Sequence, residues 1–329
     1  MCRLSILFLM LPWLLLGGLS CKENGQEDAA KPMFAFVINV PGRFWDLAHA
    51  GCRKAAREEN ALLEFHVPGQ SSAAQQFQIV ESLIAKGCNG LAISPLSPKS
   101  FGRVIDKTAD YMPVLCQDSD CPDSARRCYI GTDNVAAGRE AGKQLLAALP
   151  EGGEVAVFVG KLDVGNAEER YLGVREALEN SRCTIVDVFT DQADRTRAQS
   201  NVRTAVAKYP NLKGIVGLWG YNGFSAVSAL ADYPDHTIKI IAFDEDIETI
   251  AAIREGKIVC SVVQNPFEFG YKSIKMLGKI HRGESTEIPE DKMIYVPVRV
   301  LHKENVDVIE LDINEKLKAR DAYLKGTAK

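Results

Sequence analysis

Strand-type apolar stretches alternate with amphipathic, helix-type stretches along most of the chain. Three such pairs come first: 33–39 with 45–60, 62–67 with 73–86, and 90–94 with 99–110. After an apolar run at 114–116 the alternation restarts, with strand-type stretches at 154–159, 184–189, 214–218, 238–243 and 258–263 and helix-type stretches at 135–149, 167–180, 195–208, 224–231, 247–254 and 267–281. Such alternation is typical of parallel sheets, in which a helix connects each strand to the next.

The restart of the pattern and the length of the chain both indicate two lobes. A chain of 329 residues reaches the size at which a single hydrophobic core stops growing and a protein divides into domains. The sequence therefore predicts an α/β protein made of two doubly wound, Rossmann-like parallel-sheet lobes. A last helical stretch is expected near 314–324, within a charged C-terminal tail.

The N-terminus has the features of an export signal. Arg3 precedes an apolar run at 4–16, which is too short for a comfortable membrane span and is followed by small residues. We therefore expect a signal peptide over residues 1–20. The polar, acidic stretch 21–31 then suits a flexible tether.

Cys21 directly follows Leu19 and Ser20, and this order resembles the lipobox of bacterial lipoproteins. The resemblance implies that Cys21 is diacylated and anchors the protein to a membrane. Gly18 stands where a lipobox usually has leucine. A plain secretory signal with an unmodified Cys21 is the alternative.

Composition excludes one class of partner and otherwise describes an ordinary globular protein. Hydrophobic residues make up 46% of the chain, charged residues 25%, and the net charge is -4. A nucleic-acid-binding surface would require an excess of basic residues, so no nucleic-acid partner is expected.

Cysteine usage is unusual for an exported protein. Nine cysteines occur, two of them in the N-terminal segment, and the odd number that remains leaves at least one outside any disulfide. Cys121 and Cys128 flank a short proline-containing loop and are the predicted pair, with Cys116 as a competitor. A metal site is not expected, because neither histidine nor a CxxC spacing accompanies these three. Small apolar packing positions are expected for Cys52, Cys88, Cys183 and Cys260.

Polar residues stand at the ends of several predicted strands. Asn39, Asp118, Asp244 and Gln264 each end or follow one, and ligands of such sheets bind beyond the carboxyl ends of the strands. Aromatic faces together with paired amide, carboxylate and guanidinium groups are typical of carbohydrate pockets. A single polar residue at a strand end is more often a helix cap or a turn former, but several occur here on both halves of the chain.

From 33 to about 301 the chain resembles the periplasmic sugar-binding proteins of ABC transporters, in their ribose-binding-protein-like, type I form. The residues that carry the resemblance are Phe44-Trp45, Gly131-Thr132-Asp133-Asn134 with Gly138, Asn166 with Arg170 and Gly173, Phe243-Asp244, and Gln264.

The resemblance implies two lobes joined by three crossing strands, near Asp133, Gln264 and Lys292. The expected N-terminal lobe comprises 32–133 and 265–292. The expected C-terminal lobe comprises 134–264 and 293–312, and it leaves 313–329 as the tail.

The resemblance also implies roles for individual residues. Phe44 and Trp45 match the aromatic pair that stacks on the sugar, and Asp118, Arg170 and Asp244 match its charged partners. The predicted ligand-binding residues are Asn39, Phe44, Trp45, Asp118, Asp120, Asn166, Arg170, Trp219, Asn222, Asp244 and Gln264. In the segment 218–222 the contact is expected from Trp219, Tyr221 or Asn222, and the sequence does not decide among these three.

Departures from the family pattern bear on the ligand. Pro41-Gly42 and Ser119 replace residues that ribose binders use, so ribose itself is not implied. Asp120 lies two residues after Asp118, and in an extended chain both carboxylates would point the same way. Carboxylates with few donors favour a neutral sugar or polyol.

The implied mechanism is hinge closure over the ligand, followed by delivery to an ABC permease with its separate ATPase. The expected location is the periplasm or the outer face of the cell membrane, and the expected state is a monomer without cofactor. An enzyme lacks support, since neither a G-x-S-x-G nor an H-E-x-x-H motif occurs. The predicted signal peptide excludes a DNA-binding regulator of this fold. Presentation of the sugar or a furanosyl signal to a sensor kinase remains open beside uptake.

Overall fold

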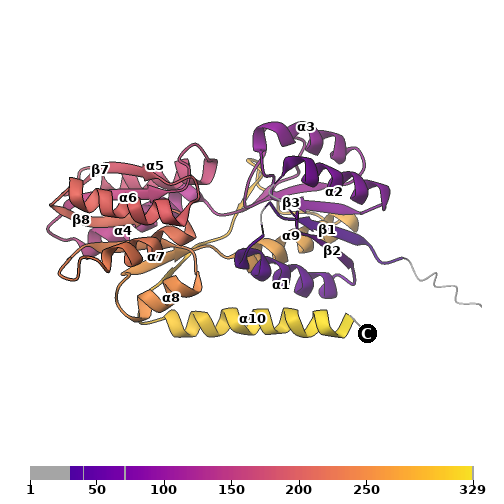
Figure 1. The fold of residues 1–329 in the computed structure, drawn as a ribbon. Coiled ribbons are helices and arrows are strands. Elements are labelled where there is room, and N and C mark those ends of the chain that lie inside the picture. The colour runs from indigo at the N-terminus through magenta and orange to yellow at the C-terminus, as the bar shows by residue number, and fades with distance from the viewer. Residues whose placement is uncertain (1–29, 40, 70–71, 328–329) are drawn as a thin grey trace, which may run out of the picture. The chain divides into compact units, whose positions relative to one another are not determined.

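The computed structural model describes residues 30–39, 41–69 and 72–327, and these contain twelve strands and ten helices. The strands form two six-stranded sheets, which define an N-lobe and a C-lobe (Figure 1). The prediction of two doubly wound, mostly parallel lobes is confirmed. The predicted signal peptide, Cys21 and most of the predicted tether lie outside the described residues.

The N-lobe sheet has the strand order β11-β5-β4-β3-β1-β2, and all of its pairs are parallel. Alternate residues of strand β1 enter opposite cores, Phe34 and Phe36 on one face and Ala35 and Val37 on the other. Helices α1 and α9 cover the first face, and α2 and α3 cover the second (Figure 1). The elements are β1 (Met33–Val37), α1 (Arg43–Glu58), β2 (Leu62–His66), α2 (Ala73–Ala85), β3 (Gly90–Ile93), α3 (Pro98–Ala109), β4 (Val114–Gln117), β5 (Tyr129–Gly131), α9 (Pro266–His281) and β11 (Met293–Tyr295).

The C-lobe sheet repeats this plan with the order β12-β10-β9-β8-β6-β7, in which only the edge strand β12 is antiparallel. Helices α4 and α5 cover one face, and α6, α7 and α8 cover the other. The elements are α4 (Asn134–Ala148), β6 (Gly153–Val159), α5 (Gly165–Leu178), β7 (Cys183–Thr190), α6 (Arg195–Lys208), β8 (Leu212–Gly217), α7 (Gly220–Leu230), β9 (Lys239–Phe243), α8 (Ile247–Arg254), β10 (Cys260–Val263) and β12 (Arg299–Leu301).

The chain passes between the two sheets three times, after β5, after β10 and between β11 and β12. The third crossing corrects the sequence prediction, which placed it at Lys292 and assigned 293–312 to the C-lobe. Met293–Tyr295 instead pairs in parallel with β5 of the N-lobe. A three-residue strand is too short to show the alternation by which strands are recognised.

The predicted boundary between 312 and a charged tail is also wrong, because α10 (Val306–Thr327) is one continuous helix (Figure 1). Its first turns form ion pairs with Arg254 of α8 through Asp307 and Glu310. Further along, Arg320 pairs with Asp46 of α1. Helix α10 therefore packs on helices of both lobes.

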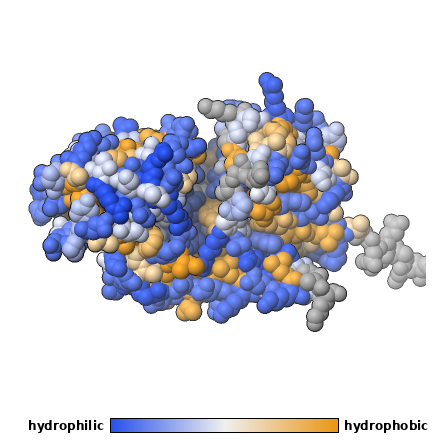
Figure 2. All heavy atoms as spheres, viewed as in Figure 1, coloured by the Kyte–Doolittle hydropathy of each residue, from blue (hydrophilic) through white to orange (hydrophobic). Residues whose placement is uncertain are grey.

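No helix in the described part of the chain combines the length and the apolar character needed to cross a membrane. On the face shown in Figure 2, hydrophilic residues cover most of the surface and apolar residues form separate patches.

Candidate functional site

Three polar side chains meet at the carboxyl ends of neighbouring N-lobe strands. The Asn39 amide donates to the Ser94 hydroxyl at 2.9 Å and to Asp118 Oδ2 at 3.3 Å. The Ser94 hydroxyl donates to the same oxygen at 2.8 Å. Strands β1, β3 and β4 are adjacent, so the parallel sheet brings these residues together.

The Asp118 carboxyl is perturbed by its surroundings. Burial raises its pKa to about 6, while the Ser94 bond and the positive charge of Arg170 oppose this shift. Its backbone lies in the left-handed region at φ 61°, which aspartate tolerates better than most residues. The strand thus ends in a sharp turn that directs an acceptor away from the sheet.

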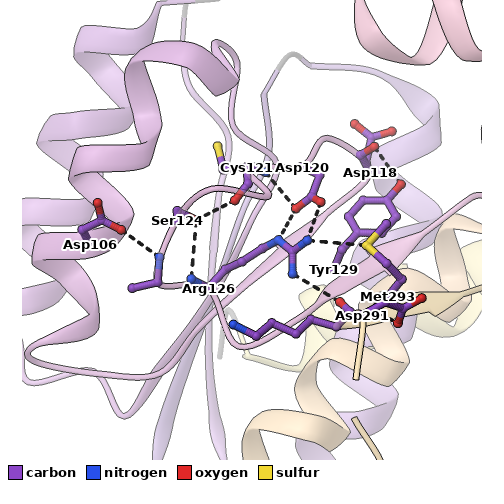
Figure 3. Close-up of polar contacts among 11 residues, drawn as sticks. Asp106, Asp118, Asp120, Cys121, Ser124, Arg126, Tyr129, Asp291 and Met293 are labelled. Carbon is purple, nitrogen blue, oxygen red and sulfur yellow. Dashed lines mark hydrogen bonds and ion pairs between the residues drawn. The ribbon is translucent and has the colours of Figure 1, made fainter. Parts of the chain in front are cut away.

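Asp120 does not share the direction of Asp118, which corrects the sequence prediction. The left-handed turn at Asp118 breaks the extended geometry on which that prediction depended. Asp120 forms an ion pair with the buried Arg126, whose Nη2 donates to Oδ2 at 2.7 Å (Figure 3). Arg126 also donates to the Lys292 carbonyl at 3.2 Å, so Asp120 helps to hold the hinge-side strand β11.

Arg170 is almost fully buried in the C-lobe, with 2% of its surface exposed. Its Nε donates to Asn134 Oδ1 at 3.0 Å and its Nη1 donates to the Leu218 carbonyl at 2.8 Å. The guanidinium carbon lies 4.6 Å from the centre of the Phe243 ring. Arg170 therefore fixes the end of β8 and the start of α4 in addition to placing a positive charge near the strand ends.

Asp244, after β9, belongs to a network that crosses the hinge. Gln264 Nε2 donates to Asp244 Oδ1 at 3.0 Å, and Gln264 Oε1 accepts from the Thr132 hydroxyl at 2.9 Å. Thr132 lies in the first crossing of the chain and Gln264 in the second. The Asp244 backbone is left-handed, at φ 62°. The structure thus connects a strand-end carboxylate directly to two hinge segments.

The two predicted stacking aromatics have different positions. Trp45 is 5% exposed and packs edge-on against Phe36 and Phe44 in the N-lobe core, with ring centres 6.4 and 4.9 Å away. This corrects the prediction that Trp45 stacks on the ligand, because its ring faces the sheet. Phe44 lines a small cavity next to Asp244, so it alone of the pair remains beside the candidate site.

Asn222 and Trp219 begin helix α7, and they differ in function. Asn222 is buried, accepts from the Trp219 backbone N–H at 3.0 Å and donates to Asp191 at 2.9 Å. Its side-chain amide is thus already bonded to the start of the helix and to Asp191. The Trp219 indole lies against Gly160 so closely that a side chain there would overlap it. Its Nε1 is buried and has no protein partner.

A cavity of about 770 Å³ lies beside these strand ends. Asp118 and Asp120 line it from the N-lobe, and Asn166 and Glu169 line it from the C-lobe helix α5. The Oδ1 atom of Asn166 is buried and has no protein partner. Burial raises the pKa of Glu169 above its usual value. The cavity is thus rich in hydrogen-bond acceptors and has room for a small polar molecule.

A second, smaller cavity of about 80 Å³ lies between Arg43, Phe44, Asp244 and Glu245, among others. Burial raises the pKa of Glu245 to about 8, and the negative charge of Asp244 adds to this. Neither oxygen of Glu245 has a hydrogen-bond partner, and neither does the buried Nε of Arg43. In the part of the chain that the structure describes, no three histidine, cysteine or acidic side chains are grouped as a metal ion would require.

Of the predicted residues, Asp118, Asp120 and Asn166 line the large cavity, and Phe44 and Asp244 line the small one. Asn39 donates a hydrogen bond to Asp118, and Gln264 donates one to Asp244, so both amides hold the carboxylates in position. Ser94, Glu169 and Glu245 also lie at the site and were not predicted from the sequence. Ser94 follows β3, so the strand-end rule used for Asn39 would have found it, whereas nothing in the local sequence distinguishes Glu169.

Comparisons with known proteins agree with this geometry. Residues 34–285 match the family described as the periplasmic binding protein domain. The D-ribose/D-allose-binding protein of Pseudomonas aeruginosa is 22% identical over 287 residues, which cover 84% of this chain and 90% of that protein.

Two solved structures are also similar. The ABC transporter solute-binding protein of Burkholderia graminis, in complex with D-arabinose, has a TM-score of 0.78 and 30% identity, and the match covers 85% of this chain and 98% of that one. A chain of the XylFII–LytSN complex has a TM-score of 0.73 and 27% identity, with 83% and 98% covered. The chain therefore belongs to the periplasmic binding protein family, and its fold is that of the type I members.

Proposed function

We propose that the protein captures a small neutral sugar or polyol between its lobes and delivers it to an ABC permease. The observation that carries this proposal is the cavity of about 770 Å³ that oxygen-bearing side chains of both lobes line. Small-molecule sites are typically of this size and present a few convergent polar groups. The similarity to a solute-binding protein solved with D-arabinose supports a monosaccharide.

The residues divide into acceptors and donors for sugar hydroxyls. Asp118 accepts, and its partners Asn39 and Ser94 hold it in place. Asn166 lines the cavity and offers an unused carbonyl oxygen, and the buried Trp219 N–H has no protein acceptor. Most of these groups are acceptors, and hydroxyl groups are donors, so a neutral polyhydroxylated ligand fits better than an acidic or phosphorylated one.

Closure of one lobe over the other produces the form that the permease recognises. The three crossings between the sheets are short, which suits a hinge. Gln264 and Thr132 connect the Asp244 carboxylate to two of these crossings. A ligand that contacts Asp244 would therefore favour one hinge arrangement over another, and the permease would bind the closed form.

Export completes the proposal. The N-terminal sequence resembles a lipoprotein signal with Cys21 as the acylated residue, and the periplasmic binding protein family acts outside the cytoplasm. We therefore place the mature protein in the periplasm or at the outer face of the membrane as a lipid-anchored monomer. It acts without cofactor or catalysis, and a separate ATPase supplies the energy.

Presentation of the ligand to a sensor kinase is a second candidate function. The observation that favours it is the similarity to a chain of the XylFII–LytSN complex at 27% identity. Both functions use the same cavity and the same closure. They differ in the partner that binds the closed form, so co-purification of the lipid-anchored protein with a permease or with a kinase would separate them.

A thermal-shift screen tests the ligand class. The protein would be heated with D-arabinose, D-ribose, D-allose, D-xylose, D-glucose and inositol, with sodium glucuronate and ribose 5-phosphate as charged controls. A ligand at about one hundred times its Kd stabilises the native state by roughly 2.7 kcal/mol, which raises the Tm by several degrees. Selective stabilisation by a neutral compound supports the proposal. Stabilisation only by the charged controls, or by none of these compounds, would overturn it.

A further inference from the structure

Two cysteines bracket the loop that carries the strand-end carboxylate of the N-lobe. Cys116 lies in β4 and Cys121 lies just after the turn formed by Asp118 and Ser119. The side chains of both cysteines are buried, with 0% and 3% exposure. The four residues between them include Asp118 and Asp120, two of the acidic residues that line the large cavity.

The two faces of the sheet decide which cysteines can meet. Cys116 and Cys121 belong to the same core cluster, on the face covered by α2 and α3. Cys128 belongs to the cluster on the opposite face, with Phe34 and Trp45, and it is a buried free thiol. A bond between Cys121 and Cys128 would have to join side chains that pack on opposite faces of the sheet, which argues against the pairing predicted from the sequence.

The Cys116 and Cys121 thiols are already in contact, because they share a hydrogen bond. In this bond the Cys116 thiol stabilises the Cys121 sulfur, which lowers the pKa of Cys121 and raises the pKa of Cys116. Burial raises the pKa of Cys128 to about 11. The lowered pKa favours the thiolate form of Cys121 over that of the other two thiols.

We propose that Cys116 and Cys121 form a disulfide in the exported protein and that this bond closes a small ring around residues 117–120. The oxidant is a disulfide-bearing donor of the exporting compartment. The Cys121 thiolate attacks a donor sulfur, which forms a mixed disulfide and releases one donor thiol. The Cys116 thiolate then attacks Cys121 Sγ and releases the second donor thiol, so two protons and two electrons leave the pair.

The ring would fix the geometry of the candidate site. Asp118 turns through a left-handed conformation inside it, and Asp120 is anchored to Arg126 beside it (Figure 3). Cys121 continues this anchoring, since its N–H donates to Asp120 Oδ1 at 2.8 Å. A covalent bond across the ring limits the conformations that the loop adopts without ligand, and it therefore favours binding. The oxidising compartment and this last consequence both rest on the proposed function.

Peptide mapping tests the bond without any ligand. The exported full-length protein would be purified without reductant, alkylated in denaturant and digested with trypsin. Cys116 and Cys121 fall on one peptide, 108–126, and Cys128 falls on another, 128–139. We expect the first peptide to be unalkylated and lighter than its reduced form by two hydrogen atoms, with Cys128 fully alkylated. Two alkyl groups on peptide 108–126, or a covalent link to Cys128, would overturn the proposal.

Hydrogen exchange of the wild-type protein measures the effect on the loop. Reduction should speed exchange at the amides of residues 117–120 by roughly tenfold, because the ring opens. The Cys128→Ser variant should show the same acceleration, and the Cys121→Ser variant should show fast exchange with and without reductant. Equal exchange rates in the oxidised and reduced wild-type protein would contradict the proposed restraint. A protein that contains the bond but binds none of the tested sugars would refute the proposed function and leave the disulfide standing.

Discussion

The two lobes use the same device at equivalent positions but connect it to different neighbours. Asp118 follows β4 and Asp244 follows β9, each the third strand from the corresponding edge of its sheet, and both adopt a left-handed backbone. Asp118 is held by Asn39 and Ser94 of its own lobe. Asp244 is held by Gln264 of the hinge. Asp118 is therefore fixed within its own lobe for ligand recognition, whereas Asp244 is also coupled to the hinge through Gln264.

The largest effect should come from Arg170, which supports the C-lobe side. The Arg170→Ala variant leaves the Leu218 carbonyl and the Asn134 amide without their buried donor. We expect the free energy of unfolding to fall by about 3 kcal/mol, measured by urea denaturation. Arg175→Ala, at an exposed position of the same helix, should change it by less than about 0.5 kcal/mol. Equal losses in the two variants would show that the Arg170 contacts contribute little.

Next in size is the ligand effect of Asp118. Asparagine tolerates the left-handed backbone, so Asp118→Asn removes the charge with little strain. We expect affinity for the sugar identified by the screen to fall about 30-fold, close to 2 kcal/mol, by isothermal titration calorimetry. Asp110→Asn, exposed at the end of α3, should leave affinity unchanged. Wild-type affinity in the Asp118 variant would remove this residue from the site.

Ser119 follows Asp118 in the N-lobe, whereas the buried Glu245 follows Asp244 in the C-lobe. This difference predicts that the free energy of unfolding depends on pH. Burial raises the pKa of Glu245 to about 8, so the native state binds more protons than the unfolded chain between about pH 4.5 and 8. The free energy of unfolding should therefore fall as the pH rises through this window, by at most about 1.4 kcal/mol per pH unit.

The Glu245→Gln variant should flatten this pH dependence in urea titrations at pH 6, 7 and 8. Glu248→Gln, exposed in the first turn of α8, should keep the wild-type slope. A steep slope that persists in the Glu245 variant would place the titrating group elsewhere.

The smallest expected loss of affinity distinguishes residues that act on the hinge from residues that act only on the binding site. Gln264→Leu removes the bonds to both Asp244 and Thr132, whereas Asn39→Ala removes a support of Asp118 inside one lobe. We expect each to weaken sugar binding by about 1 kcal/mol. Only the Gln264 variant should change the radius of gyration of the ligand-free protein in small-angle X-ray scattering. A similar change in the Asn39 variant would contradict the division between the lobes.

The sequence was sufficient to predict the parts that depend on periodicity. Alternating strand and helix patterns located the two doubly wound lobes, and the strand-end rule found Asn39, Asp118 and Asp244. Parallel strands bring their carboxyl ends together whatever the details of packing. This is why residues far apart in the chain could be grouped before their contacts were known.

The errors arose where a residue's direction depends on tertiary packing. Trp45 belongs to the buried face of α1, and an aromatic near a helix start has the same local sequence whether it faces a core or a cleft. Asp120 turns toward Arg126 because Asp118 adopts a left-handed backbone, which no pattern in the sequence records. Cys116 and Cys128 lie on opposite faces of the sheet because of the register of β4 and β5. These strands are too short for the sequence pattern to show which face each residue occupies.

Hydrogen exchange of the wild-type protein with and without its sugar shows whether strand ends of both lobes contact one ligand. We expect slower exchange, on saturation with the sugar, both at residues 117–120 after β4 and at residues 244–246 after β9. Protection in one lobe alone, or only at surfaces away from the two cavities, would contradict it.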